Sequence, residues 1–232
     1  MKYIVSLLIG ILVGVVAFAL ALVYNPFISD RGLSPLSVSD AEVMSLGYTV
    51  VPAETIAYTN DGESLQTPHP VKVLQLWEAP VRKTTAMAVL LHDARNQPAG
   101  VGVKVSSLSE SSQLLSGNAM VDSVWYVFLP EDGGMFISQT ENYWTFMKEV
   151  AFPAWRSSAN NWRGTWLGDL TTGPGALGTA AVTGSSGRFN GLEMEALESL
   201  SVRAFSSDTG FVSAEGRLLI ELPVQAVDAP AD

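Results

Sequence analysis

Short runs of strand-forming residues, separated by turn-forming residues, recur along most of the chain after Gly47. The runs are rich in Val, Ile, Thr and aromatic residues, and the residues between them are rich in Gly, Pro, Asn and Asp. This spacing is typical of an antiparallel sandwich or barrel. The predicted strands are Tyr48–Val51, Glu54–Thr59, Val71–Trp77, Thr84–Leu91, Val101–Val105, Ser123–Leu129, Met135–Thr140, Gly164–Leu170, Thr179–Thr183, Leu192–Phe205 and Phe211–Leu222.

Three segments resemble, in the same order, the barrel of the allene oxide cyclase and dirigent families. Gly178–Gly191 (GTAAVTGSSGRFNG) is similar to their strand-turn-strand signature. Leu90–Val105 is similar to a strand, a polar turn and a glycine-marked strand, and Val124–Gln139 to a hairpin with Asp-Gly in its turn. The resemblance spans residues 85–222. It implies a mainly β fold, a calycin-type antiparallel β-barrel with an apolar interior, and it assigns no catalytic residue to this chain.

The glycine turn within this resemblance has a physical interpretation. Gly184 and Gly187 would allow a tight reversal, Phe189 would pack beneath it, and Gly191 would let the backbone of the next strand approach closely. The sequence departs from the family pattern at Ser185, which replaces the second turn glycine, and at residues 192–194, which replace a small-basic-glycine segment.

The N-terminal end of the chain carries a long apolar run. Residues 4–23 are interrupted only by Ser6, Gly10 and Gly14, and about 20 apolar residues span a bilayer. We therefore expect residues 1–24 to form an uncleaved transmembrane anchor, with a cytoplasmic N-terminus and a periplasmic or otherwise extracytoplasmic domain. The alternative is a signal peptide of residues 1–19 or 1–21, which would leave the domain secreted.

The remaining chain divides into three predicted parts. Residues 25–47 form a juxtamembrane linker with one short helix, because Ser39-Asp40-Ala41-Glu42 has capping-box spacing and Gly47 can end a helix. Residues 48–223 form the barrel domain, in which residues 141–175 resemble an aromatic-rich insertion. Residues 224–232 form a frayed tail.

Charge and cysteine content exclude several kinds of partner and site. The chain has 13 Lys and Arg against 23 Asp and Glu, a net charge of −10, and no cysteine. Binding to phosphate backbones requires clustered basic residues, so we expect no nucleic-acid partner. Neither histidine has spaced carboxylate partners, so we predict no metal site, and we predict no cofactor. The sequence does not indicate an oligomeric state.

His92, Glu193 and Glu195 are the candidate acid–base residues. Glu193 and Glu195 share one face of a strand, and a carboxylate pair inside a barrel could transfer protons. The alternation is explained more simply by apolar residues facing inward and these glutamates facing outward. Glu198 is out of register with the pair, which suggests a bulge. His92 comes at a strand end, where a turn role competes with catalysis.

An aromatic cluster between Tyr143 and Trp166 holds four of the six tryptophans. Such rings could line a ligand mouth, pack as ordinary core, or contact a membrane or another protein. The predicted ligand-binding residues are Trp144, Trp155, Trp162, Trp166, Arg156 and Arg163.

These observations predict a membrane-anchored, extracytoplasmic barrel that binds a small apolar ligand without turnover. One alternative is a non-catalytic envelope interaction or assembly module. The other is an isomerase or cyclase on the same barrel, which would need an ionisable residue facing the interior.

Overall fold

The computed structural model describes residues 10–18, 42–51, 59–60, 64–65 and 84–223. Residues 10–18 are helical. In these ranges, no helix has both the length and the apolar character that a membrane crossing needs. The rest of the expected anchor, most of the linker, the predicted strand Val71–Trp77, nearly all of Glu54–Thr59 and the tail lie outside the described residues. The anchor and its orientation therefore stay predictions.

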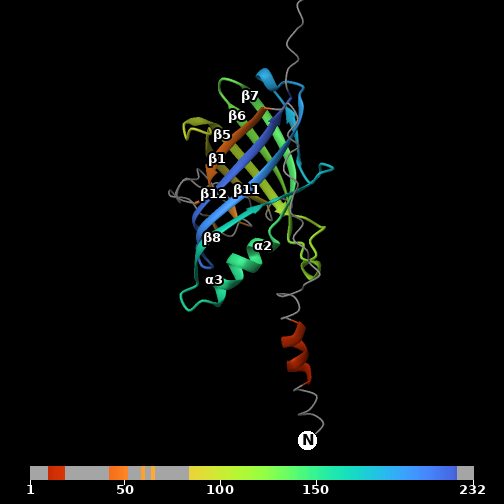
Figure 1. Cartoon of the computed structure of the whole chain (residues 1–232), viewed down its shortest axis with the longest axis vertical. Helices are drawn as coiled ribbons and strands as arrows, with labels where there is room; N and C mark the ends of the chain where they lie inside the picture. Colours follow the sequence, from red (N-terminus) through yellow and green to blue (C-terminus); the bar gives the residue numbers. More distant parts are fainter. Residues whose placement is uncertain (1–9, 19–41, 52–58, 61–63, 66–83, 224–232) are drawn as a thin grey trace, which may run out of the picture.

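Eight antiparallel strands of the described chain close into a barrel (Figure 1). Their order around the ring is β10-β11-β12-β1-β4-β5-β6-β7, and β7 pairs with β10 to close it. The antiparallel barrel predicted from the sequence is thus confirmed. The ring strands are β1 (Glu42–Thr49), β4 (Thr84–His92), β5 (Pro98–Leu108), β6 (Met120–Leu129), β7 (Gly133–Asn142), β10 (Ala180–Gly184), β11 (Glu193–Ser206) and β12 (Gly210–Leu222).

Additional short elements lie beside the ring. β2 (Thr59–Asn60) pairs with β3 (Ser64–Leu65), β8 (Asn161–Asp169) pairs with β11, and β9 (Thr171–Gly173) pairs with β7. A helical segment follows β7 and lies at the lower end of the barrel in Figure 1. It consists of α2 (Trp144–Phe146), the π-helical turn η4 (Met147–Ala151) and α3 (Phe152–Arg156). Two 3-10 turns, η3 (Leu114–Ser116) and η5 (Gly187–Phe189), complete the described elements.

The prediction of a short helix before Gly47 is wrong, because residues 42–49 form the strand β1. Leu46 and Tyr48 are only 2% and 4% exposed, and they alternate with less buried neighbours as a strand requires. β1 pairs with β12 over its full length, from Glu42 opposite Leu222 to Thr49 opposite Glu215. Pairing and burial in the barrel outweigh the local capping-box pattern, so the barrel begins at residue 42 rather than 48.

The glycine turn between β10 and β11 adopts a tight conformation. A Cβ at Gly184 would overlap the carbonyl oxygen of Phe189, and Gly187 and Gly191 have φ of +63° and +75°. Phe189 is 1% exposed and packs in the barrel core. The turn therefore requires glycine at the buried Gly184, favours it at Gly187 and Gly191, and places one aromatic ring inside.

Two apolar clusters fill the interior at different levels. The larger occupies the upper barrel and includes Trp125, Ile137, Phe189 and Leu218. The smaller, which includes Phe146, Trp166, Leu170, Leu200 and Val202, lies where the helical segment packs on β8 and β11. Along β11, Ala196 belongs to the larger cluster and Leu200 to the smaller, and the inward residue between them is Glu198. A polar layer thus separates the two clusters.

Candidate acid–base site in the barrel interior

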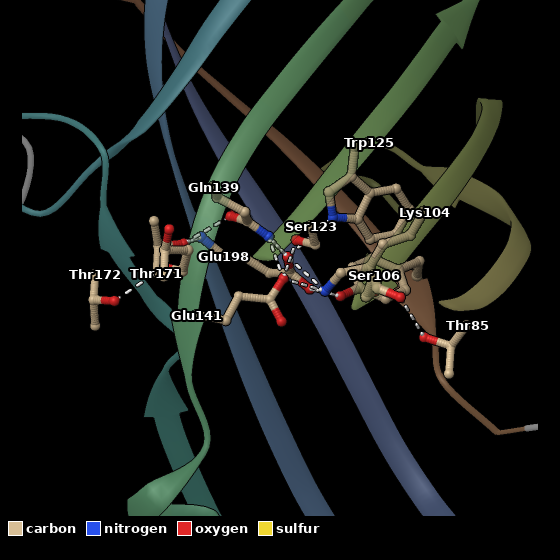
Figure 2. A network of polar contacts seen from close by, with 12 residues as sticks. Thr85, Lys104, Ser106, Ser123, Trp125, Gln139, Glu141, Thr171, Thr172 and Glu198 are labelled. Carbon is tan, nitrogen blue, oxygen red and sulfur yellow. Dashed lines mark hydrogen bonds and ion pairs between the residues drawn. The ribbon is translucent and has the colours of Figure 1, made fainter. Parts of the chain in front are cut away.

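Three ionisable side chains from three strands meet in this polar layer (Figure 2). Lys104 of β5 places its Nζ 2.6 Å from Oε1 of Glu141 on β7 and 2.8 Å from Oε1 of Glu198 on β11. The three residues are 6%, 0% and 0% exposed. Two carboxyl groups therefore share one ammonium group inside the barrel.

Glu198 is the fully hydrogen-bonded member of the group. Its carboxylate accepts hydrogen bonds from Lys104, from the Tyr48 hydroxyl, from Trp125 Nε1 at 3.0 Å and from Gln139 Nε2. Burial alone would raise the pKa of Glu198, but Lys104 and the hydrogen-bond donors outweigh it and lower the pKa. Glu198 is therefore the ionised partner of Lys104.

Glu141 is partnered through only one of its two oxygens. Oε1 accepts from Ser123 Oγ at 2.5 Å, from Gln139 Nε2 at 2.6 Å and from Lys104. Oε2 is buried and has no hydrogen-bond partner among the described residues. Burial raises the pKa of Glu141, and the nearby charge of Glu198 raises it further against the opposing effect of Lys104. Glu141 is therefore the carboxyl group that takes up a proton first.

The remaining titratable groups of the layer keep their protons. Burial alone would lower the pKa of Lys104, but Glu141 and Glu198 together raise it. Burial, and then the charge of Glu198, raise the pKa of Tyr48 well above its ordinary value. Lys104 thus stays an ammonium group, and Tyr48 stays a neutral donor to Glu198.

Thr171 fixes the relative positions of β7 and β11 at this level. β10 pairs with β7 only at residues 135–138, so the lower part of β7 is free to pair with β9. The Thr171 hydroxyl donates to Gln139 Oε1 at 2.9 Å and accepts from the backbone N–H of Glu198 at 2.8 Å. This side chain therefore orients the amide that contacts both carboxyl groups.

Strand alternation carries the ionisable groups inward. On β7, Met135, Ile137, Gln139 and Glu141 are all buried, and the residues between them are more exposed. Glu198 follows Met194 and Ala196 in the same way on β11. The charged side chains thus continue the inward face of strands whose upper halves are apolar.

The interior is more accessible at its lower end, on the side of β4 to β6. Leu91, Val127 and Ile137 in the upper barrel are fully buried. At the lower end, Thr85 and Ser106, which follow Met87 and Lys104 in the inward alternation, are half-buried, as is Val121. Thr85 and Ser106 are labelled beside Lys104 in Figure 2. The inward face is therefore less deeply buried at this end of the barrel than in its upper part.

The three predicted acid–base candidates all lie outside the interior. Glu193 and Glu195 are exposed on the outer face of β11, where Thr179 Oγ1 donates to Glu195 Oε2 at 2.9 Å. His92 ends β4 opposite Gly47, which lies between the inward Leu46 and Tyr48, so the His92 side chain is on the outer face. The structure brings none of the three near Glu141.

The predicted aromatic site is divided between core and surface. Trp166 is 6% exposed, and with Trp162 it packs in the smaller cluster, its ring 5.5 Å from that of Phe146. Trp155 is 66% exposed and packs beside Phe152, which Arg156 also covers. The half-buried Trp144 begins α2, and Arg163 is exposed on β8. Ligand binding by these residues stays a prediction.

Sequence reasoning missed Lys104 and Glu141 and misplaced Glu198. The bulge proposed near Glu198 is wrong, since the register shift lies between Val202 and Ala204. Counting in twos from Met194 would have placed Glu198 inward. Lys104 gave a weaker signal, because β5 turns its valines outward and Gly102 and Lys104 inward.

Comparison with known proteins adds a distant structural likeness. No family model and no curated protein matches the chain. Among solved structures, the chain is similar to a nonspecific heme-binding cyclase that catalyses a 4 + 2 cycloaddition during neoabyssomicin biosynthesis. The sequence identity is 10% and the TM-score is 0.38, and the match covers 81% of this chain and 66% of that one. It is also similar to the Diels-Alderase AbmU from Streptomyces koyangensis, at 11% identity and a TM-score of 0.38, covering 80% and 65%.

The chain spans just under two thirds of the length of these two structures. Similarity at this level transfers no activity, so the description of the barrel depends on its own strand order. Neither structure is an allene oxide cyclase or a dirigent protein, and that family stays a resemblance. Across residues 10–18, 42–51 and 84–223, no group of three or more His, Cys, Asp or Glu side chains is arranged to hold a metal ion.

Proposed function

We propose that the barrel interior is the active site of a small-molecule isomerase or cyclase, in which Glu141 is the proton-transferring group. One observation carries this proposal: Glu141 is wholly buried, its pKa is raised, and its Oε2 has no partner among the described residues. A carboxyl group with a raised pKa is suited to general acid–base catalysis near neutral pH.

The neighbours of Glu141 have distinct positioning roles in this proposal. Glu198 balances the charge of Lys104, so Lys104 does not force Glu141 to ionise. Gln139 and Ser123 hold Oε1, which directs the other oxygen away from them. The protonated Oε2 can then donate to an oxygen atom of a bound molecule.

The proposed chemistry conserves atoms and protons. Glu141 donates its proton to a substrate oxygen while a C–H or O–H bond of the same substrate breaks, and that second proton returns to the carboxylate. Bond rearrangement within the substrate then gives an isomer or a ring of unchanged mass. This class of reaction requires no external oxidant or reductant.

The proposal departs from the non-catalytic binder that the sequence favoured. That prediction placed the ligand contacts on aromatic residues, whereas the most unusual chemistry of the described chain lies in the polar layer. A substrate would still need an apolar body to fit beside the two clusters, with one oxygen group to meet Glu141. Membrane anchoring remains compatible with this function and stays a separate proposal.

The test compares the full chain with Glu141→Gln and Glu195→Gln. Each variant is incubated with a small-molecule extract of the source cells, and the mixture is analysed by liquid chromatography and mass spectrometry. The wild type and Glu195→Gln should convert one compound into another of identical mass and different retention time, and Glu141→Gln should not. Equal conversion by all three proteins would refute the assignment of Glu141.

A further inference from the structure

The outer wall formed by β4, β5, β6 and β7 has an unusually apolar surface. Eight large apolar side chains on this wall are between 37% and 47% exposed. They are cross-strand neighbours, as Val101 lies opposite Phe128, Val103 opposite Tyr126, and Tyr126 opposite Phe136. The apolar wall consists of Leu90, Val101, Val103, Val105, Val124, Tyr126, Phe128 and Phe136.

Charge is distributed very differently on the opposite wall. The outward positions of β11 and β12 include Glu193, Glu195, Arg203, Glu215, Arg217 and Glu221. At the outward positions of β5, β6 and β7, Asp122 is the one carboxylate, and it lies at the lower rim. A continuous uncharged sheet face of this kind marks an interaction surface.

We propose that this apolar wall is the interface of a two-fold symmetric dimer of this chain. A net charge of −10 per chain makes two copies repel one another wherever their acidic surfaces meet. The apolar wall is the part of the described barrel where two copies can approach without opposing carboxylates. The dimer is two-fold symmetric because both copies use the same patch.

The size of the apolar wall is sufficient for a dimer of modest stability. Aromatic side chains carry about 150–250 Å² each and aliphatic ones somewhat less, so the observed exposures leave roughly 500–600 Å² of apolar surface per chain. Two copies would bury about 1,000–1,200 Å², near the lower limit of specific interfaces.

The relief of the apolar wall is self-complementary. Its upper rows carry the bulky Phe128, Tyr126 and Phe136. Its lower row borders a hollow of about 400 Å³, lined by residues that include Val105, Ser107, Asp122, Val124, Ser138 and Thr140. These six side chains are on the outer face, whereas Ser106, Ser123 and Gln139, which also line the hollow, belong to the inward face. The hollow therefore lies at the lower edge of the outer wall. A two-fold axis that lies in the plane of the interface and runs across the strands lays the bulky rows of each copy over the hollow of the other.

Sedimentation of the full chain in a mild detergent tests this dimer. The wild type should have twice the protein mass of one chain, and Val103→Lys and Tyr126→Lys should have the mass of one chain with unchanged circular dichroism. Val212→Lys is the matched control, because Val212 is 52% exposed on β12. It should remain dimeric. A monomeric wild type, or dimers that persist in all three variants, would overturn the proposal.

Crosslinking locates the contact independently. The chain has no cysteine, so Val103→Cys creates a unique thiol in the middle of the wall, and Val212→Cys creates one on the opposite side. A short bis-maleimide should link two copies of Val103→Cys and leave Val212→Cys unlinked. Linking of Val212→Cys alone would contradict the interface. So would a monomeric wild type that binds lipid vesicles, if Val103→Lys abolishes that binding. None of these outcomes depends on Glu141, so the dimer and the proposed enzyme are tested separately.

Discussion

Lys104 Nζ lies 2.6 Å from Oε1 of Glu141, within a barrel interior where a second carboxylate already balances its charge. One ammonium group therefore serves two buried carboxyl groups. Full ionisation of all three would leave a net negative charge away from water, which is unfavourable. Protonation of Glu141 removes that charge, and the distribution of hydrogen bonds determines that Glu141 rather than Glu198 is protonated.

Removal of the ammonium group should destabilise the barrel strongly. In Lys104→Met, two buried carboxyl groups lose their cation, and we expect the free energy of unfolding to fall by about 3–5 kcal/mol. Lys148→Met is the control, because Lys148 is partly exposed and its Nζ lies 3.6 Å from Glu149. Lys148→Met should lower the free energy of unfolding by less than about 1 kcal/mol. Urea unfolding followed by tryptophan fluorescence measures the loss of stability in both variants. Equal losses would show that Lys104 does not neutralise the buried carboxyl groups.

The stability of the wild type relative to Glu141→Gln should fall as pH rises. Burial raises the pKa of folded Glu141, so its contribution to stability is fully present below its unfolded pKa and is lost as pH rises through the folded one. The decline begins at the ordinary glutamate value of about 4.3 and continues upward. Glutamine at this position cannot ionise and removes the effect. The midpoint of urea unfolding, measured for both proteins between about pH 4 and pH 8, tests this dependence. If the midpoints of the two proteins change with pH in parallel, the pKa of Glu141 is not raised.

Glu198 should produce the opposite dependence on pH. Lys104 and its hydrogen-bond donors lower the pKa of folded Glu198, so its contribution is present above the unfolded pKa and is lost as pH falls through the folded one. Glu198→Gln should therefore reduce the loss of stability in acid while lowering stability at neutral pH. Acid unfolding of this variant and of the wild type tests this prediction. An equal or larger loss of stability in acid for Glu198→Gln would contradict it.

Gly216 should not tolerate a side chain. A Cβ there would overlap the ring of Tyr48, which donates to Glu198 and packs edge-on against Trp125 with ring centroids 4.9 Å apart. Gly216→Ala should lower the free energy of unfolding by about 1–3 kcal/mol. Gly47→Ala is the matched control in β1, since nothing lies within 4 Å of its added Cβ. Thermal unfolding compares them, and an equally mild effect at Gly216 would contradict the packing.

The aromatic cluster should separate into core and surface residues. Trp166→Ala removes a buried ring from the smaller cluster and should cost about 3–5 kcal/mol of stability. Trp155 is largely exposed, and Trp155→Ala should change stability by about 0.5 kcal/mol. If Trp155→Ala instead unfolds the barrel, its surface placement is wrong. If it folds normally and alters ligand uptake, the predicted ligand-binding role of this residue gains support.

The barrel was predictable because its strands carry strong local signals. Thr84–His92 and Gly210–Leu222 agree closely with the strands predicted from the sequence. β1 was partly mistaken for a helix, since the capping-box pattern is local and the partner strand β12 is about 170 residues away. The helical segment of residues 144–156 was missed because its rings suggested an insertion of unspecified structure.

The polar layer was harder to predict than the barrel that contains it. Lys104 is flanked by Val103 and Val105, and a sequence reader expects valines inside and lysine outside. In the barrel, Lys104 faces inward and the two valines face outward, where they form part of the apolar wall. Glu141 and Glu198 are 57 residues apart, and their proximity depends on Thr171, which links β7 to β11. Single-strand patterns do not contain that information.

The most direct test of the proposed enzyme is the identity of molecules that copurify with the full chain. Wild type, Glu141→Gln and Glu195→Gln are isolated gently, weighed by native mass spectrometry, and denatured to release any bound compound for chromatography. If Glu141 transfers the proton, all three proteins should release a compound of one mass. The compound from Glu141→Gln should have a different retention time, because that variant retains the unconverted isomer. The same isomer from all three proteins, or no bound compound in any of them, would contradict the claim that Glu141 transfers a proton to a substrate.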